Sequence, residues 1–344
     1  MKGKLSFIHH SAFIIHHFFL LSIHVNFFRL STHIEKLMQV PGLRGVIYRL
    51  GVAGRRAAFA ARSAADYARL RAARTGTRPG VTAVVVGRND DYMPDFRQRL
   101  EATVRWNHEH LADEVIFVEW NPPPERDLLA KELTRKFPFV RAYVVPPEIH
   151  DAVCHNPNIK LLEYHAKNVG LRRARTPWVI TTNADALFAP DAVRALLAGP
   201  LSEDEVWTTE RVDIHWREGR ERPVRLLDTL RFRRRLAYEP LGTGEFAFAS
   251  RALWHRARGY DESLSRHRIG ADLRGVAQML TLGGRTRRAG TVLHMAHPSS
   301  CSEGVQPHHG EWATLDGVPY ANPDSWGLGD RVEVEIGERI WLLR

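Results

Sequence analysis

The sequence predicts an α/β protein whose mixed, mostly parallel β-sheet is flanked by helices, and three observations lead to this prediction. Residues 81–86 form a near-continuous β-branched run, which is typical of a strand buried on both faces. From there onward, runs of strand composition alternate with segments of helical apolar spacing, as in βαβ units. Several predicted strands end in acidic or amide residues, at the edge where open α/β sheets bind ligands.

The predicted elements alternate along the chain, and each is recognised by the period of its apolar residues. In chain order they are a strand at 81–86, a helix at 93–110, a strand at 114–119, a helix at 125–137 and strands at 140–145 and 178–182. Because helices separate the strands, we expect neighbouring strands to be parallel.

The composition is that of a globular protein with a sizeable core. The chain has 344 residues, 44% of them apolar, which allows one large α/β domain, alone or with appendages. The two cysteines, Cys154 and Cys301, have no metal-type spacing and imply no disulfide framework. We therefore expect a cytoplasmic protein, with association with the inner face of the membrane as a further option.

Residues 1–37 differ in composition from the rest of the chain. They are rich in Ile, Phe, Ser and His and hold 6 of the 18 histidines. The apolar stretch 7–28 has roughly the length of a membrane span, but five histidines inside it would be costly in hydrocarbon. We interpret residues 1–37 as a non-native extension that precedes a true start at Met38, and a signal anchor is the alternative.

Residues 38–80 form a basic segment with loosely helical apolar spacing. Nine arginines and one acid, Asp66, lie between 41 and 80, which accounts for +8 of the formal net charge of +10. Such an amphipathic helix suits peripheral contact with an anionic membrane through residues 41–78. A solvated helix leading into the domain explains the pattern equally well. We expect no nucleic-acid partner, because no recognised binding motif or aromatic stacking series is present.

The segment after the strand at 178–182 carries the first functional signal. Asn183 and Asp185 stand at positions i and i+2, so an extended backbone presents both side chains on one side. Two oxygen ligands together suit a divalent cation that holds a phosphate. A helix N-cap followed by a turn is the alternative, because Asn and Asp are ordinary in both.

Other strand ends add polar groups to the same predicted edge. Asn89 and Asp90 follow the first strand, and Glu119 ends the second. The chain has neither a GxGxxG sequence after the first strand nor a P-loop lysine, which disfavours both of those phosphate sites. Each polar residue alone is explained by turn formation or capping. Together they predict a nucleotide site.

The order of these motifs resembles glycosyltransferase family 2, whose members have the GT-A fold of nucleotide-diphospho-sugar transferases. Ala166-Lys-Asn-Val-Gly170 is similar to the family signature that precedes the D-x-D strand, and Asn183-Ala-Asp185 stands in the D-x-D position. The segments 244–251 and Gly259-Tyr-Asp-Glu262 resemble acceptor-side motifs, and Ala271-Asp272-Leu273 stands where the family has E-D-x-x-L. The resemblance covers roughly 81–298, and 299–344 is expected to be a loop and a tail that packs on this domain.

The resemblance implies an enzyme, a hexosyltransferase-type glycosyltransferase of class EC 2.4. It would move a sugar from a nucleotide-diphosphate donor to a hydroxyl of a glycan or lipid-linked acceptor, for a cell-envelope polysaccharide or glycoconjugate. The family likeness implies inversion at the sugar and help from Mn²⁺ or Mg²⁺.

The resemblance also implies roles for single residues. Asp272 is the candidate catalytic base, for which a helix-start residue is the alternative. The residues implied in donor binding are Asn89, Asp90, Glu119, Lys167, Asn168, Asn183 and Asp185. Glu245, Asp261 and Glu262 are implied in acceptor binding, with fixing of their loop as the alternative for Asp261 and Glu262. Asp185 and His294 are the expected metal ligands, with His294 ranked ahead of His297.

Two departures from the family pattern keep other functions open. Asn183 replaces the first aspartate of D-x-D, and Ala271 replaces the glutamate before Asp272. A nucleotide-sugar-binding or carbohydrate-binding protein without catalysis is therefore the second hypothesis. A sugar nucleotidylyltransferase is the third, but residues 87–91, GRNDD, are a poor match to the Gly-rich basic loop that it needs.

Overall fold

The computed structural model describes residues 80–90, 92–93, 95–197, 201–216, 222–223, 244–266, 270–297 and 320–344. The predicted extension 1–37, the basic segment 38–80 except for its last residue, and the loop 299–319 lie outside the described residues. Among the residues that the structure describes, no helix combines the length and the apolar character that crossing a membrane requires.

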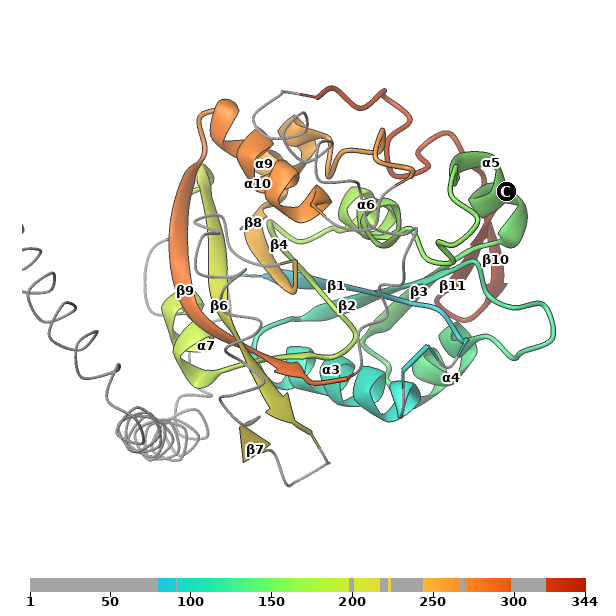
Figure 1. The fold of residues 1–344 in the computed structure, drawn as a ribbon, viewed down its shortest axis with the longest axis horizontal. Coiled ribbons are helices and arrows are strands. Elements are labelled where there is room, and N and C mark those ends of the chain that lie inside the picture. The colour runs from blue at the N-terminus through green and yellow to red at the C-terminus, as the bar shows by residue number, and fades with distance from the viewer. Residues whose placement is uncertain are drawn as a thin grey trace, which may run out of the picture. The chain divides into compact units, whose positions relative to one another are not determined.

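The domain is built on one 11-stranded mixed sheet with the order β10-β11-β3-β2-β1-β4-β8-β6-β9-β5, and β7 pairs with β6 (Figure 1). The strands are β1 (Val81–Gly87), β2 (Glu114–Trp120), β3 (Val140–Val145), β4 (Trp178–Thr182), β5 (Ala186–Phe188), β6 (Glu205–His215), β7 (Arg222–Pro223), β8 (Phe246–Ser250), β9 (Arg285–Met295), β10 (Glu333–Gly337) and β11 (Ile340–Leu343). The predicted α/β class with a sheet flanked by helices is confirmed.

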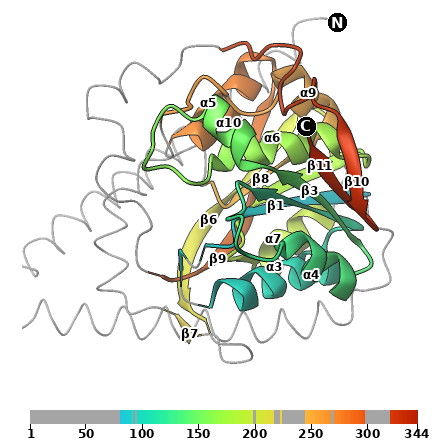
Figure 2. The ribbon, with the colours of Figure 1, turned by 90° about the vertical axis from the view of Figure 1, so that its right-hand side faces the viewer.

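Helices cover both faces of the sheet, as Figures 1 and 2 show from two directions. One face carries α3 (Phe96–His110), α4 (Leu129–Lys136) and α7 (Pro190–Leu197). The other carries α5 (Pro147–Val153), α6 (Glu163–Arg173), α9 (Arg251–Ala257) and α10 (Ala271–Thr281). Two apolar cores result, one between each helical layer and the sheet.

Strand β1 shows why the sequence forms this layered arrangement. All seven of its residues are buried. Val81, Ala83 and Val85 pack into the core under α3 and α4, whereas Val84 and Val86 pack into the core under α6. The two-residue period of a strand thus sends alternate side chains into opposite cores, which explains the absence of polar side chains at most of these positions.

Four consecutive pairings of the sheet are parallel: β11 with β3, β3 with β2, β2 with β1, and β1 with β4. Gly87 pairs with Glu119, and Val85 pairs with Thr182, so the carboxyl ends of β1, β2 and β4 lie at one edge. The remaining pairings are antiparallel, except that β6 and β9 are parallel. The polar residues that follow β1, β2 and β4 therefore lie at the same edge of the sheet.

Strand β5 places the end of β9 at this edge of the sheet. It is antiparallel to β9, with Ala186 opposite His294. The amide of Met295 donates to the carbonyl of Asp185 at 2.8 Å. A segment about one hundred residues further along the chain is thereby placed beside the turn that joins β4 to β5.

Candidate functional site

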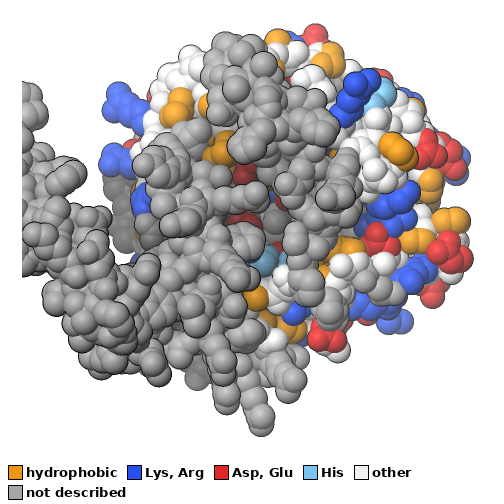
Figure 3. All heavy atoms as spheres, viewed as in Figure 1, with side chains coloured by type: hydrophobic (Ala, Val, Ile, Leu, Met, Phe, Trp, Pro, Cys, Tyr) orange, Lys and Arg blue, Asp and Glu red, His pale blue; other side chains and the backbone are white. Residues whose placement is uncertain are grey.

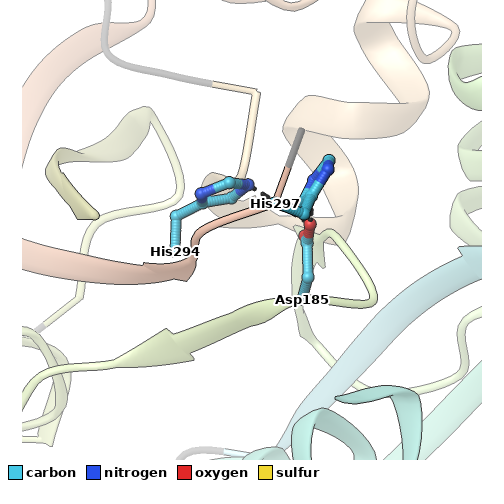
Figure 4. Close-up of side chains that lie close together, drawn as sticks. All are labelled: Asp185, His294 and His297. Carbon is cyan, nitrogen blue, oxygen red and sulfur yellow. Dashed lines mark ion pairs between the residues drawn. The ribbon is translucent and has the colours of Figure 1, made fainter. Parts of the chain in front are cut away.

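The carboxylate of Asp185 and the rings of His294 and His297 form one cluster at this edge (Figure 4). Oδ2 of Asp185 lies 3.2 Å from Nε2 of His294 and 2.9 Å from Nε2 of His297. One ligand atom from each residue lies within 4.8 Å of the others. Asp185 comes from the turn after β4, His294 from β9 and His297 from just beyond it, so the fold assembles the cluster from two segments.

The chemistry of this cluster suits a divalent cation. A carboxylate oxygen and imidazole nitrogens are both common ligands of such ions. Burial opposes ionisation of Asp185, but the two histidines outweigh that effect and hold the pKa of its carboxyl well below its usual value. The carboxylate is thus ionised across the physiological pH range, as a metal ligand must be.

Lys167 lies at the centre of a second set of contacts. Its ammonium group is fully buried and donates to Oε1 of Glu163 at 2.7 Å, to Oδ1 of Asn183 at 2.8 Å and to the carbonyl of Gly244 at 2.9 Å. An ammonium group has three hydrogens, and these acceptors match them in number. Lys167 therefore joins α6, the end of β4 and the segment before β8.

Asp272 stands in the first turn of α10, beside this lysine network. A Cβ atom added to Gly244 would lie 3.0 Å from Oδ2 of Asp272 and 2.5 Å from the hydroxyl of Tyr164, so only glycine fits here without a shift. Burial and, next, the nearby carboxylate of Glu245 raise the pKa of Asp272 to about 6, although Lys167 opposes the shift. The carboxyl is therefore a stronger base than an ordinary aspartate.

Arg211 connects the two sets of contacts. Its guanidinium is paired with Oε1 of Glu245 and also lies 2.9 Å from Nδ1 of His294. Glu245 follows Gly244, whose carbonyl accepts from Lys167. Contacts therefore run from Asp185 through His294 and Arg211 to Glu245, next to Gly244, beside which Asp272 lies. Figure 3 shows acidic side chains and a histidine near the middle of this face of the molecule.

The residues after β1 also reach the strand edge. Asp90 is ion-paired with Arg88, and its Oδ1 is buried without a hydrogen-bond partner among the described residues. The side-chain amide of Asn89 donates to the backbone carbonyl of Asp127 at 2.8 Å. Arg88 also lines a cavity of about 580 Å³, together with Asn121 and residues that follow β3.

Glu119 is buried and points its carboxylate at the start of α4. Its two oxygens accept from the amides of Leu129 at 3.0 Å and Ala130 at 2.8 Å. Burial raises the pKa of Glu119 to about 7, against the lowering effect of these two hydrogen bonds. The carboxylate thus satisfies two amides that the helix itself leaves unpaired.

Asn168 and the acidic pair after Tyr260 hold a loop in place. The side chain of Asn168 accepts from the amide of Tyr260 at 2.7 Å and donates to Oε1 of Glu262 at 3.0 Å. Glu262 also accepts from the amide of Gly327, and Asp261 is ion-paired with Arg274. These contacts support the loop-fixing role for the two acids, and their role toward an acceptor stays a prediction.

Sequence reasoning ranked His297 behind His294 and did not single out Arg211 or Glu163. His297 contacts Asp185 as closely as His294 does, and the His-x-x-His spacing was the available signal. Arg211 and Glu163 carried no sequence signal, because a charged residue in a strand or a helix is usually solvated. Only the pairing of β6 with β9 shows that Arg211 lies near His294.

Comparisons with known proteins show similarity in structure only. No protein-family model and no curated protein matches the sequence. Among solved structures, a mannosyltransferase from Pyrobaculum calidifontis in complex with GDP-mannose and Mn²⁺ has a TM-score of 0.41 and 20% identity, with 67% of this chain and 59% of that chain covered. A mycobacterial protein has a TM-score of 0.39 and 16% identity, with 67% of this chain and 71% of that chain covered.

Proposed function

We propose that this protein is a metal-assisted glycosyltransferase that moves a sugar from a nucleotide-diphosphate donor to a hydroxyl acceptor. One observation carries the proposal: a cation-binding type of cluster and a basic carboxylate belong to one network at the edge of the sheet. Asp185 with two histidines forms the cluster, and Asp272 is the carboxylate. Sugar transfer from a diphosphate needs these two functions at one place.

Asp185, His294 and His297 would hold the cation. A bound divalent ion supplies neutralisation of the negative charge that develops on the departing diphosphate. The two imidazoles favour Mn²⁺ over Mg²⁺, because Mg²⁺ prefers oxygen ligands and near-ideal octahedral geometry. Oxygen atoms of the donor diphosphate would complete the coordination of such an ion.

Asp272 would accept the proton of the acceptor hydroxyl at its carboxylate. A pKa of about 6 keeps the group ionised near neutral pH, while making it more basic than an ordinary aspartate. Lys167 is held by three acceptors of the chain, so its role is to keep Asn183 and Gly244 in position beside this carboxylate. Base catalysis of this kind corresponds to an inverting reaction.

The nucleoside part of the donor would occupy the cavity at the ends of β1, β2 and β3. Its volume of about 580 Å³ lies in the usual range for small-molecule sites. Arg88 and Lys160 place cationic side chains along its wall. Oδ1 of Asp90, which has no hydrogen-bond partner among the described residues, supports a polar ligand close by, because a buried oxygen without a partner costs about 1–3 kcal/mol.

The acceptor would be a glycan or a lipid-linked saccharide. Glu245 follows Gly244 and its charge acts on Asp272, which supports it as a contact for the acceptor hydroxyl. A polysaccharide or glycoconjugate of the cell envelope is the product that this chemistry would serve.

The proposal is tested by release of nucleoside diphosphate from UDP-, GDP- and dTDP-sugars, with and without Mn²⁺. We expect one donor to be turned over only with the ion, and the Asp185→Asn and Asp272→Asn variants to lose at least about 100-fold in rate. Asp204→Asn is the control, because its side chain is exposed in a pair with Arg256.

The same assay separates catalysis from binding. A wild-type protein that binds a sugar nucleotide in calorimetry but releases no diphosphate would be a binding protein, as the replacements at Asn183 and Ala271 allow. A wild-type protein that binds none of the three donors would exclude both functions.

A further inference from the structure

Helix α3 contacts both segments that carry the predicted metal ligands. Arg99, Thr103 and Trp106 stand at positions i, i+4 and i+7, so they share one side of the helix. Each of the three is a hydrogen-bond donor to a backbone carbonyl elsewhere in the chain. The row lies among the apolar buried side chains of Phe96, Leu100 and Val104, with Asn107 as a further buried polar residue of the helix.

The first donor of this row holds the segment between the two histidines. Arg99 is 6% exposed, and its guanidinium donates to the carbonyls of Met295 at 2.7 Å and Ala296 at 3.4 Å. These two residues separate His294 from His297 and lie where β9 ends. A fork of guanidinium donors therefore fixes the backbone from which both rings project.

The other two donors hold the segment that carries the carboxylate. The hydroxyl of Thr103, fully buried, donates to the carbonyl of Ala184 at 3.0 Å. Ala184 stands between Asn183 and Asp185. The indole nitrogen of Trp106 donates to the carbonyl of Phe188, three residues after Asp185, at 3.0 Å. One helix thus sets the backbone on both sides of the metal cluster.

An apolar side chain at position 99 would hold α3 to the sheet without the desolvation cost of a buried guanidinium. Taking a guanidinium out of water is unfavourable, and burial accordingly lowers the pKa of Arg99, with the charge of Asp185 opposing that shift. The group also lies 5.7 Å from the ring of Trp216. Its hydrogen bonds to the carbonyls of Met295 and Ala296 are what an apolar side chain would not supply.

We propose that the donor row Arg99, Thr103 and Trp106 of α3 positions Asp185, His294 and His297 for cation binding. This inference rests on the proposed function, because it concerns the ion of that site. The three donors bond to backbone carbonyls beside the ligand residues, so they are positioning residues. Partners that orient metal ligands in this way change affinity by about 10–100-fold when removed.

The test measures the Mn²⁺ dissociation constant from the electron paramagnetic resonance of free Mn²⁺, beside unfolding in urea without metal. Arg99→Met and Thr103→Val should each weaken Mn²⁺ binding by about 10-fold or more. Arg99→Lys should recover part of the loss, because an ammonium group can reach one carbonyl but not span both.

Arg339→Met is the matched control. Arg339 also binds backbone carbonyls, those of Thr134, Phe137 and Val140, but in the turn between β10 and β11. We expect it to lower stability while Mn²⁺ affinity stays within about 2-fold of wild type. The inference is overturned if Arg99→Met and Thr103→Val bind Mn²⁺ like wild type, or if Arg339→Met weakens binding as much as they do.

A readout without metal keeps this inference separate from the proposed function. The ¹⁵N resonances of the His294 and His297 rings in metal-free protein report their contacts with Asp185. They should shift in Arg99→Met and Thr103→Val but not in Arg339→Met, and unchanged shifts would overturn the positioning role. A wild-type protein that binds no Mn²⁺, with rings that still respond to Arg99→Met, would refute the metal centre but support the role of α3.

Discussion

The ammonium nitrogen of Lys167 lies 2.8 Å from Oδ1 of Asn183, so a cation of the chain itself holds the first residue of the strand-end motif. The same nitrogen lies 2.7 Å from Oε1 of Glu163. Glu163 already supplies one negative charge to this buried lysine, and a neutral asparagine adds a hydrogen bond without a second charge. An asparagine at position 183 therefore has a physical reason within the fold.

Replacing Lys167 with Met should destabilise the protein by about 3–5 kcal/mol, because three acceptors lose their donor and Glu163 loses its counter-charge. Urea unfolding measures the change. Combining Lys167→Met with Glu163→Gln should recover part of the loss, since the uncompensated charge is then removed as well. A change below about 1 kcal/mol for Lys167→Met would contradict the central position of this lysine.

The rate of sugar transfer should fall as the pH is lowered through about 6. Burial and the nearby Glu245 raise the pKa of Asp272 to about 6, so below that pH the carboxyl carries a proton and is unable to accept another. The acidic limb of kcat/KM against pH would show this midpoint. Asp272→Asn should lower the rate by at least about 100-fold and abolish the acidic limb of the pH profile. A limb that persists in the variant would assign the titration to another group.

His297→Ala and His294→Ala should weaken Mn²⁺ binding to a similar degree, because Nε2 of each ring lies within 3.2 Å of Oδ2 of Asp185. Calorimetry of the metal-free protein gives both affinities. Prolonged treatment with EDTA should abolish turnover, and added Mn²⁺ should restore it more fully than Mg²⁺. If His297→Ala binds Mn²⁺ like wild type, the ion is held without that histidine.

The stability of the protein should fall between pH 4.5 and 7 partly because of Glu119. Burial raises its pKa from 4.5 to about 7, so the folded protein binds more protons than the unfolded chain in this window. The free energy of unfolding then decreases as the pH rises through the window. Glu119→Gln should make that decrease shallower in urea unfolding at pH 5 and pH 7. An unchanged slope would show that Glu119 does not titrate there.

Glu119→Gln should also cost about 1–2 kcal/mol at pH 5, and this cost should shrink toward pH 8, because the variant carries no charge that burial penalises. The two carboxyl oxygens of Glu119 accept from the amides of Leu129 and Ala130 at the start of α4. A glutamine offers one oxygen to these two amides. Circular dichroism of the folded variant distinguishes this local loss from a general failure to fold.

The sequence predicted the first four strands and their order with little ambiguity. The strands at 140–145 and 178–182 have the predicted bounds, and β1 extends one residue beyond its prediction. Buried strands are readable because both of their faces need apolar side chains, so their composition depends little on distant partners. Helix starts were less well predicted: α4 begins at Leu129 rather than at 125, because its first amides are satisfied by the distant Glu119.

The sequence also indicated Asp185, Asp272 and His294 as residues of one site, through motif spacing and strand ends. Tertiary structure alone decided which partner each of these side chains contacts. Nothing near Glu119 in the sequence shows that its carboxylate points to α4, and nothing near Arg211 shows that it lies 2.9 Å from His294. Hydrogen bonds depend on positions in space to within tenths of an ångström, and pairings between distant strands and helices set those positions.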